Sequence, residues 1–347
     1  MPITGLGPHG ERASPPQLLG LSETEMAQVR ERRFNLAVVL HTTSSDWAKQ
    51  QLAGIVLTLG RHAANVIEVI DCEFDYSTQI NALERLAKEP PDAVISIPIG
   101  NAAVADAHRK ISRTGSKLIL LDNAPTGLIP GTDYASVVSA DNFGLGQIGA
   151  ELLSPYLTPA DSVGILSYGI DFFATHEREI AFRKWMENHR PDVKIRTARF
   201  TSINLVAPMV DGFLAADPHI KGLFAVWDEP AMQAVAAIQS RSRDIPITTV
   251  DLGNAAATEM AGGGLIKGIG AQRPFDQGVA AATAALQALL GREPPPWVAL
   301  PGIAVTRANV VEAYQTIWHA PAPSELLSAL KGSGANATKL PPKTTSV

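Results

Sequence analysis

Cysteine is nearly absent from this sequence, since Cys72 is the only one among 347 residues. A single cysteine excludes an internal disulfide and a cysteine-based zinc site. The 29 basic residues are outnumbered by 34 acidic ones, and a net charge of −5 gives no reason to expect nucleic-acid binding. No run of about 18 apolar residues is present, so we expect no transmembrane helix.

Signatures of common enzyme sites are also missing. The chain has no Gly-rich phosphate loop, no GxSxG and no HExxH. His41, Asp122 and His176 could imitate an acid–base set, but we assign no catalytic residue, cofactor or metal. The N-terminal stretch MPITGLGPHGERASPPQ has neither the basic start nor the apolar core of a secretory signal. Either the protein is cytoplasmic, or a signal was removed before this numbering began.

Strand-like and helix-like patterns alternate from Phe34 onward. Hydrophobic residues make up 46% of the chain and charged residues 18%, which predicts a soluble globular protein. We expect strands at 34–40, 66–70, 93–97, 118–121, 137–138, 163–166, 193–198, 222–226, 247–250 and 266–269. We expect helices at 77–88, 102–114, 142–157, 175–189, 203–216, 229–240, 254–262 and 274–290. Such alternation indicates parallel sheets covered by helices, and ten strands favour two similar halves with a cleft between them.

The two ends of the chain have a different composition. Residues 1–21 are rich in Pro and Gly and should be loose or lie on a surface. In the rest of this N-terminal arm, residues 22–33 predict a short helix, because Ser22 and Glu25 have the spacing of a capping box. The PPP stretch at 294–296 opens a late segment. Residues 331–347 are typical of a disordered tail.

The stretch from Phe34 to Gly54 predicts a buried strand, a polar turn and a helix. In open α/β sheets, ligands lie beyond the carboxyl ends of the strands. His41, Ser45 and Trp47 are therefore placed where a small polar molecule could be held, although Ser45 is also a suitable helix cap.

Further polar clusters follow later strands, and each also has a structural explanation. Asp122 and Asn123 could start a turn or accept hydrogen bonds from a ligand. Asp141 and Asn142 precede a helix, which capping explains well. His176 could be a surface helix residue.

In the same region, we expect Arg178 to form a structural ion pair. Trp227 could pack between domains, or it could stack on a sugar with Asp228 and Glu229 beside it. Asp251 again follows a strand. GAQRPFDQG places Gln272 and Arg273 at a crossover, where Pro274 opens a helix.

Taken together, these clusters resemble a known family. HTTSSDW, AVWDEPA and GAQRPFDQG, in this order and spacing, resemble the ribose-binding type of periplasmic substrate-binding protein (periplasmic binding protein type I) from about Phe34 to Ala320. The resemblance implies two Rossmann-like α/β lobes with parallel sheets, a ligand cleft between them and a hinge of crossover strands. It implies ligand roles for His41, Ser45, Trp47, Asp122, Asn123, His176, Phe200, Trp227, Asp251 and Gln272. It places Asp141, Asn142 and Arg273 at the hinge.

The resemblance also divides the chain. Lobe one should hold 34–140 and 273–302, and lobe two should hold 141–272 and 303–330. Ribose binders usually carry Arg where this chain has Asn123 and His176, and Asn where it has Trp227. Because guanidinium groups are fixed multidentate donors, their loss favours a smaller sugar, a sugar alcohol or a related polyol over ribose itself.

The implied function is that of a monomeric binding protein that delivers a small neutral carbohydrate or polyol to the membrane permease of an ABC importer. This implies a periplasmic location after removal of a signal. One alternative is the ligand-sensing domain of a LacI-type transcription regulator, which shares the fold. That protein would need a helix-turn-helix of about 50–60 residues, whereas 33 residues precede Phe34. An α/β enzyme is the third and least favoured interpretation.

Overall fold

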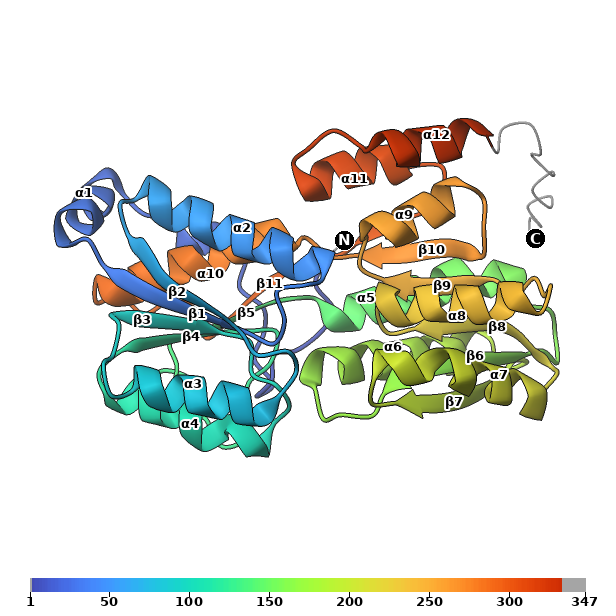
Figure 1. Cartoon of the computed structure of the whole chain (residues 1–347), viewed down its shortest axis with the longest axis horizontal. Coiled ribbons are helices and arrows are strands. Elements are labelled where there is room, and N and C mark those ends of the chain that lie inside the picture. The colour runs from blue at the N-terminus through green and yellow to red at the C-terminus, as the bar shows by residue number, and fades with distance from the viewer. Residues whose placement is uncertain (1, 333–347) are drawn as a thin grey trace.

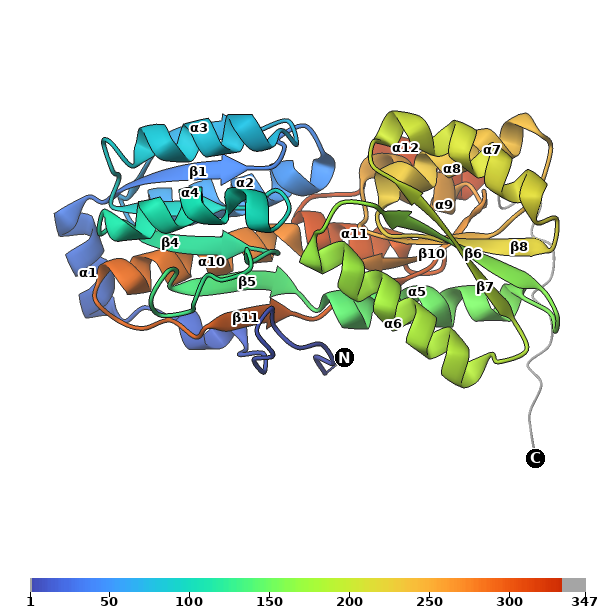
Figure 2. The ribbon, with the colours of Figure 1, turned by 90° about the horizontal axis from the view of Figure 1, so that it is seen from below.

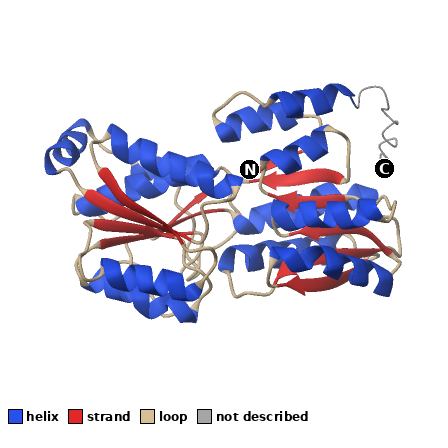
Figure 3. Ribbon diagram, viewed as in Figure 1, coloured by secondary structure: helices blue, strands red, loops and turns tan. Residues whose placement is uncertain are grey.

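Two six-stranded sheets, one in each of two α/β lobes, form the framework of the computed structural model, which describes residues 2–332 (Figure 1). Helices cover both faces of each sheet (Figure 3). Within the described residues, no helix is both long enough and apolar enough to cross a membrane.

The sheet of lobe one has the order β11-β5-β4-β3-β1-β2, and all of its strand pairs are parallel. Its strands are β1 (Asn35–Leu40), β2 (Asn65–Asp71), β3 (Ala93–Ser96), β4 (Lys117–Leu121), β5 (Ser136–Ala140) and β11 (Trp297–Leu300). Burial on both faces explains why β1, β3 and β4 have the continuous apolar sequences that made them visible in the sequence.

The sheet of lobe two has the order β12-β10-β9-β8-β6-β7. Its strands are β6 (Ser162–Tyr168), β7 (Lys194–Phe200), β8 (Ile220–Ala225), β9 (Ile247–Val250), β10 (Ile266–Ala271) and β12 (Ile303–Val305). β12 runs antiparallel to β10, and the other pairs are parallel. The predicted fold class is therefore confirmed, with one antiparallel strand at the edge of lobe two.

The helices follow the predicted alternation. Lobe one has α2 (Asp46–Arg61), α3 (Tyr76–Leu86), α4 (Ala102–Arg113) and α10 (Pro274–Leu289). Lobe two has α5 (Asn142–Leu153), α6 (Phe173–His189), α7 (Val206–Ala216), α8 (Asp228–Ser240), α9 (Asn254–Ala261), α11 (Val310–Trp318) and α12 (Ser324–Gly332). In the N-terminal arm, α1 (Glu23–Arg32) begins with the predicted capping box of Ser22 and Glu25.

Several boundaries differ from the sequence prediction. The helix predicted over 142–157 ends at Leu153 and is followed by a 3-10 turn at Ser154–Tyr156, where Pro155 lacks an N–H for a helical bond. β11, β12, α11 and α12 were not predicted. The tail predicted from residue 331 begins inside α12, and its remainder, 333–347, lies outside the described residues.

The chain passes between the two sheets three times: between β5 and α5, between β10 and α10, and between β11 and β12. We retain the proposed lobes, 34–140 with 273–302 and 141–272 with 303–330, because this division puts each passage at a sheet boundary. The arrowheads of both sheets point toward the junction between the lobes, so the carboxyl ends of the strands face each other there (Figure 1).

The helices α2 and α10, which cover the lobe-one sheet, pack against each other in close contact. A Cβ atom on Gly54 of α2 would overlap the carbonyl oxygen of Phe275, and one on Gly278 of α10 would overlap the carbonyl oxygen of Gln51. Glycine at both positions therefore lets the two helix backbones approach directly.

We predict that Gly54→Ala lowers the free energy of unfolding by about 1–3 kcal/mol, because the added methyl group forces the helices apart. Gly60→Ala is the matched control in the same helix. No atom lies within 4 Å of its added Cβ, and Ala should stabilise the helix by about 0.5–1 kcal/mol. Urea unfolding followed by circular dichroism measures both changes, and equal effects of the two variants would contradict the close contact.

Candidate functional site

A cleft between the facing strand ends is the candidate site. It contains about 770 Å³ of empty space, part of it open to solvent. Both lobes contribute to its lining, which consists of His41, Thr42, Ser45, Trp47, Phe74, Ile99, Gly100, Asp122, Tyr168, Ile170, Phe172, Ala174, Thr175, Arg178, Trp227, Asp228, Glu229, Asp251 and Gln272.

The structure brings most of the expected ligand residues together at this cleft. Seven of them line it: His41, Ser45, Trp47, Asp122, Trp227, Asp251 and Gln272. The other three, Asn123, His176 and Phe200, are not part of the lining. Whether any of the ten contacts a ligand remains a prediction.

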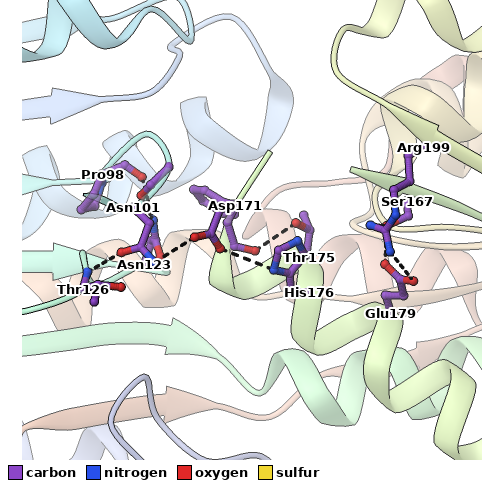
Figure 4. A network of polar contacts seen from close by, with 12 residues as sticks. Pro98, Asn101, Asn123, Thr126, Ser167, Asp171, Thr175, His176, Glu179 and Arg199 are labelled. Carbon is purple, nitrogen blue, oxygen red and sulfur yellow. Dashed lines mark hydrogen bonds and ion pairs between the residues drawn. The ribbon is translucent and has the colours of Figure 1, made fainter. Parts of the chain in front are cut away.

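Asn123 and His176 each have a structural partner (Figure 4). The Asn123 amide donates to the carbonyl oxygens of Pro98 and Gly100, and so holds the turn whose Gly100 lines the cleft. Nδ1 of His176 lies 3.6 Å from the Asp171 carboxylate, at the rim of lobe two. Asp122, the neighbour of Asn123, and Thr175, the neighbour of His176, line the cleft instead.

Phe200 is also displaced from the cleft by its neighbours. Its side chain is buried, and its ring packs against the rings of Tyr168 and Trp227 at centroid distances of 5.6 and 5.2 Å. Tyr168 and Trp227 line the cleft themselves. Phe200 therefore supports an aromatic wall from behind.

Asp122 is the most exceptional group of the cleft. Its side chain is 2% exposed, and neither carboxylate oxygen makes a hydrogen bond of ordinary geometry in the described structure, although the backbone N–H of Ala140 and the Gln51 amide lie near enough to lower its pKa. Loss of solvation raises the pKa of Asp122 to about 7, with Arg178 opposing the shift and Asp251 adding to it. A buried acceptor without a partner costs about 1–3 kcal/mol, so this carboxylate is poised to accept donors from a ligand.

Arg178 supplies the positive charge of the cleft, a role that the sequence analysis missed. Its guanidinium is 4% exposed and donates from Nε to Oδ1 of Asn142 at 2.9 Å and from Nη1 to the carbonyl of Val226 at 2.8 Å. No ion pair holds it among the described residues, so the expected structural ion pair is wrong. Its spacing of three from Thr175 places both residues on one face of α6, a signal that the sequence contained.

Asp251 lies at the end of β9 and is held by a chain of amides. Its Oδ1 accepts from Nε2 of Gln272 at 2.5 Å, and Oε1 of Gln272 accepts from Nε2 of Gln277 at 3.1 Å. Gln277 in turn accepts from Gln51 at 3.3 Å. Burial raises the pKa of Asp251, while Arg178 opposes this shift. The chain links a carboxylate of lobe two to two helices of lobe one.

Asp228 contributes a third carboxylate at the start of α8. Its Oδ2 accepts from the N–H of Gly253, the residue that precedes α9, at 2.8 Å. Burial and the nearby Asp251 raise the pKa of Asp228 well above its ordinary value. Beside it, the indole N–H of Trp227 donates to Glu229 at 3.3 Å.

Aromatic rings form the apolar part of the lining. The ring of His41 meets Trp47 and Phe74 edge-on, at centroid distances of 5.7 and 4.8 Å, and stacks with Phe172 of lobe two at 6.4 Å. Loss of solvation lowers the pKa of His41 to about 4, so this ring is neutral at pH 7. The sequence analysis did not assign Phe74 or Phe172, because neither directly follows an expected strand.

The two lobes touch on both sides of the cleft. Oδ2 of Asp46 in lobe one accepts from the backbone and side-chain N–H groups of Asn254 in lobe two, at 2.9 and 3.0 Å. Nδ2 of Asn101 donates to Oδ2 of Asp171 across the other side at 2.9 Å (Figure 4). The structure is therefore a closed arrangement of the lobes.

The expected hinge residues lie at two of the passages between sheets. Asp141 caps α5 through the N–H of Gly144 at 3.0 Å, and Asn142 holds Arg178. Arg273 precedes α10 and pairs with Asp276 at 2.7 Å. Their role in lobe motion remains a prediction.

Comparison with known proteins identifies the family. The family model described as periplasmic binding protein domain matches residues 36–293, which include most of both sheets and the cleft. The chain belongs to the periplasmic binding protein domain family.

Individual relatives of this periplasmic binding protein are distant. The ribose import binding protein of Bacillus subtilis is 24% identical over 222 residues, which are 64% of this chain and 70% of the relative. A carbohydrate-transporter binding protein from Agrobacterium radiobacter, solved with D-arabinose, has a TM-score of 0.74 and 20% identity over 82% of this chain and 99% of its own. One from Agrobacterium vitis, solved with allitol, has a TM-score of 0.71 and 17% identity over 81% and 98%. These structural likenesses show the fold.

No group of three or more His, Cys, Asp or Glu side chains within residues 2–332 is arranged to hold a metal ion. The cleft lining of this periplasmic binding protein offers hydrogen bonding and ring stacking by its own side chains. Carboxylates and an amide accept or donate on one side, and aromatic faces provide the apolar contacts.

We predict that Asp122→Asn stabilises the ligand-free protein at pH 8 by about 4 kcal/mol and has little effect at pH 4. The folded pKa of about 7 lies above the ordinary value for Asp, so the folded state holds the proton more tightly than the unfolded state. The free energy of unfolding of the wild type therefore falls as pH rises from about 4 to 7. Urea unfolding across this range tests the difference, and a gap between the proteins that is constant with pH would contradict the buried carboxyl.

Proposed function

We propose that the protein binds a small neutral sugar or sugar alcohol in the cleft and delivers it to the permease of an ABC importer. The observation that carries this proposal is the buried Asp122 carboxylate, whose two oxygens have no hydrogen-bond partner. A polyhydroxy ligand supplies adjacent O–H donors that satisfy both oxygens, and each satisfied acceptor removes a penalty of about 1–3 kcal/mol.

The rest of the lining suits the same ligand class. Lobe two lies opposite Asp122 and supplies both Arg178, which offers N–H donors to hydroxyl oxygens, and Asp251, which offers acceptors. Trp47 and Trp227 line the cleft, and the apolar C–H face of a sugar can stack on such rings. For Asn123, His176 and Phe200 we propose an indirect role, in which each supports the lining residues beside it.

The charge of the cleft argues against anionic ligands. Arg178 faces the carboxylates Asp122, Asp228 and Asp251, so the buried charge is negative when they are ionised. A phosphate or carboxylate ligand normally needs a cluster of cations or a phosphate-binding loop. Sugar phosphates, amino acids and nucleotides should therefore not bind.

The relatives support the transport role. The curated relative is a ribose import binding protein, and the solved relatives were found with D-arabinose and allitol. These comparisons favour a solute-binding protein over a LacI-type regulator or an α/β enzyme. Family membership implies a location outside the cytoplasm, and we propose a monomeric periplasmic protein that meets its permease when the lobes are closed.

A ligand screen tests the proposed function. Ligand at 100 times its dissociation constant adds about 2.7 kcal/mol to the folded state, which corresponds to a rise in melting temperature of roughly 5 °C at this chain length. The panel should hold C4 to C6 sugars and polyols, including D-arabinose and allitol, beside phosphorylated sugars and amino acids. We expect shifts with neutral polyhydroxy compounds only. A shift with a phosphate ester or an amino acid alone would exclude the proposal.

Calorimetry with the best ligand then tests the site. Asp122→Ala should weaken binding by about 1–3 kcal/mol, since the ligand hydroxyls lose their acceptor. Asp244→Ala is the control, because Asp244 is an exposed carboxylate that is not part of the lining. We expect the control to keep wild-type affinity, whereas unchanged affinity in Asp122→Ala would remove this residue from the site.

A further inference from the structure

The N-terminal arm, residues 2–33, precedes the part of the chain that matches the family, which begins at residue 36. It lies along the free edge of β11 in lobe one (Figure 2). The N–H of Ser14 donates to the carbonyl of Trp297 at 2.9 Å, and the N–H of Ala299 donates to the carbonyl of Ser14 at 3.3 Å. The arm thus adds a one-residue bridge to the edge of the sheet.

Two further contacts anchor the arm to lobe one. The side chain of Leu19 is 1% exposed and belongs to the core of that lobe. Nε2 of Gln287, in α10, donates to the carbonyl oxygens of Leu18 and Gly20 at 3.3 Å each. Buried apolar surface and hydrogen bonds therefore fix the arm between residues 14 and 20.

The beginning of the arm reaches the passage between β5 and α5. The N–H of Thr4 donates to Oδ2 of Asp141 at 2.8 Å, and the N–H of Gly5 donates to Oδ1 at 2.9 Å. The same carboxylate caps α5, the first helix of lobe two. One buried carboxylate thus joins the arm to the start of lobe two.

A second contact extends the arm onto lobe two itself. Oγ1 of Thr4 lies 3.1 Å from Oε1 of Gln147, one turn further along α5. The fit at Gly5 is tight, because an added Cβ would lie 2.7 Å from Oδ1 of Asp141 and 3.1 Å from Cβ of Phe143. The arm therefore bridges the lobes on the hinge side, opposite the mouth of the cleft.

We propose that Thr4 and Gly5 are positioning residues for ligand binding, which act through Asp141. Lobe opening requires α5 to turn relative to β11, because the chain passes between the sheets at this point. The arm is anchored on lobe one, so this turn stretches its contacts to Asp141 and Gln147. Contacts that exist only in the closed arrangement shift the population toward it. The arm thus favours closure and slows ligand release, and only the ligand measurements rest on the proposed function.

The test compares Gly5→Val with Leu6→Ala in the full chain. The valine side chain should push the arm off Asp141, whereas Leu6 is exposed in the same arm and its truncation should be neutral. Small-angle X-ray scattering of the ligand-free proteins should give a larger radius of gyration for Gly5→Val only. Stopped-flow fluorescence with the best ligand of the screen should show a dissociation rate about five to twenty times faster, with the association rate nearly unchanged.

A third variant and a stability measurement separate positioning from mere structural support. Thr4→Val keeps both N–H bonds to Asp141 and loses the hydroxyl contacts with Gln147 and with Oδ2 of Asp141, so its dissociation rate should lie between wild type and Gly5→Val. If Gly5→Val lowers the free energy of unfolding but leaves the radius of gyration and the dissociation rate unchanged, the proposal is overturned. If the wild type binds no neutral ligand, the proposed function fails, while the scattering data still decide on the arm.

Discussion

A carboxylate buried without a hydrogen-bond partner is the constraint on which the cleft depends. Asp122 is buried away from solvent, and its oxygens make no hydrogen bond of ordinary geometry within the described structure. Protonation, which the raised pKa near 7 makes accessible, relieves this cost only in part, because the buried carboxyl still lacks partners. A ligand rich in hydroxyl groups relieves it more completely, and this links the energetics of the empty protein to the chemistry of what it binds.

Both lobes present a carboxylate by the same backbone device. Asp122 and Asp251 follow β4 and β9 and adopt left-handed conformations, with φ of 54° and 73°. The N–H of each still donates to the neighbouring strand, from Asp122 to Val138 and from Asp251 to Gly270. The left-handed conformation costs of order 1–2 kcal/mol for a residue other than glycine. The strained backbone at the two strand ends thus directs two carboxylates, one from each lobe, toward the same cleft.

Continuous apolar runs predicted the alternating α/β elements, because buried parallel strands leave such runs, and the runs placed Asp122 and Asp251 at strand ends. The ligand roles of these two residues and of Gln272 were implied by the family resemblance. The prediction failed where a shift of one residue decides which side chain points toward the cleft. Asn123 turns toward Pro98 while its neighbour Asp122 lines the cleft, and strand periodicity carries no information about that turn. Arg178 was missed because its acceptors, Asn142 and Val226, are distant in the sequence.

The same limit applies to the edges of the fold. β12 has three residues, which is too short for a periodic signal. The bonds from Thr4 and Gly5 to Asp141 connect positions more than a hundred residues apart through main-chain donors, and no side-chain pattern announces them. At these positions, tertiary contacts and not the local sequence pattern determine the structure of the segment.

A crystal structure of the protein with the best ligand of the screen tests the central claim most directly. The account predicts ligand hydroxyl oxygens within hydrogen-bond distance, about 2.5–3.0 Å, of both carboxylate oxygens of Asp122. It also predicts a C–H face of the ligand against the aromatic lining. A ligand bound elsewhere, or an Asp122 carboxylate that is satisfied by protein groups while the ligand lies beyond its reach, would contradict the account.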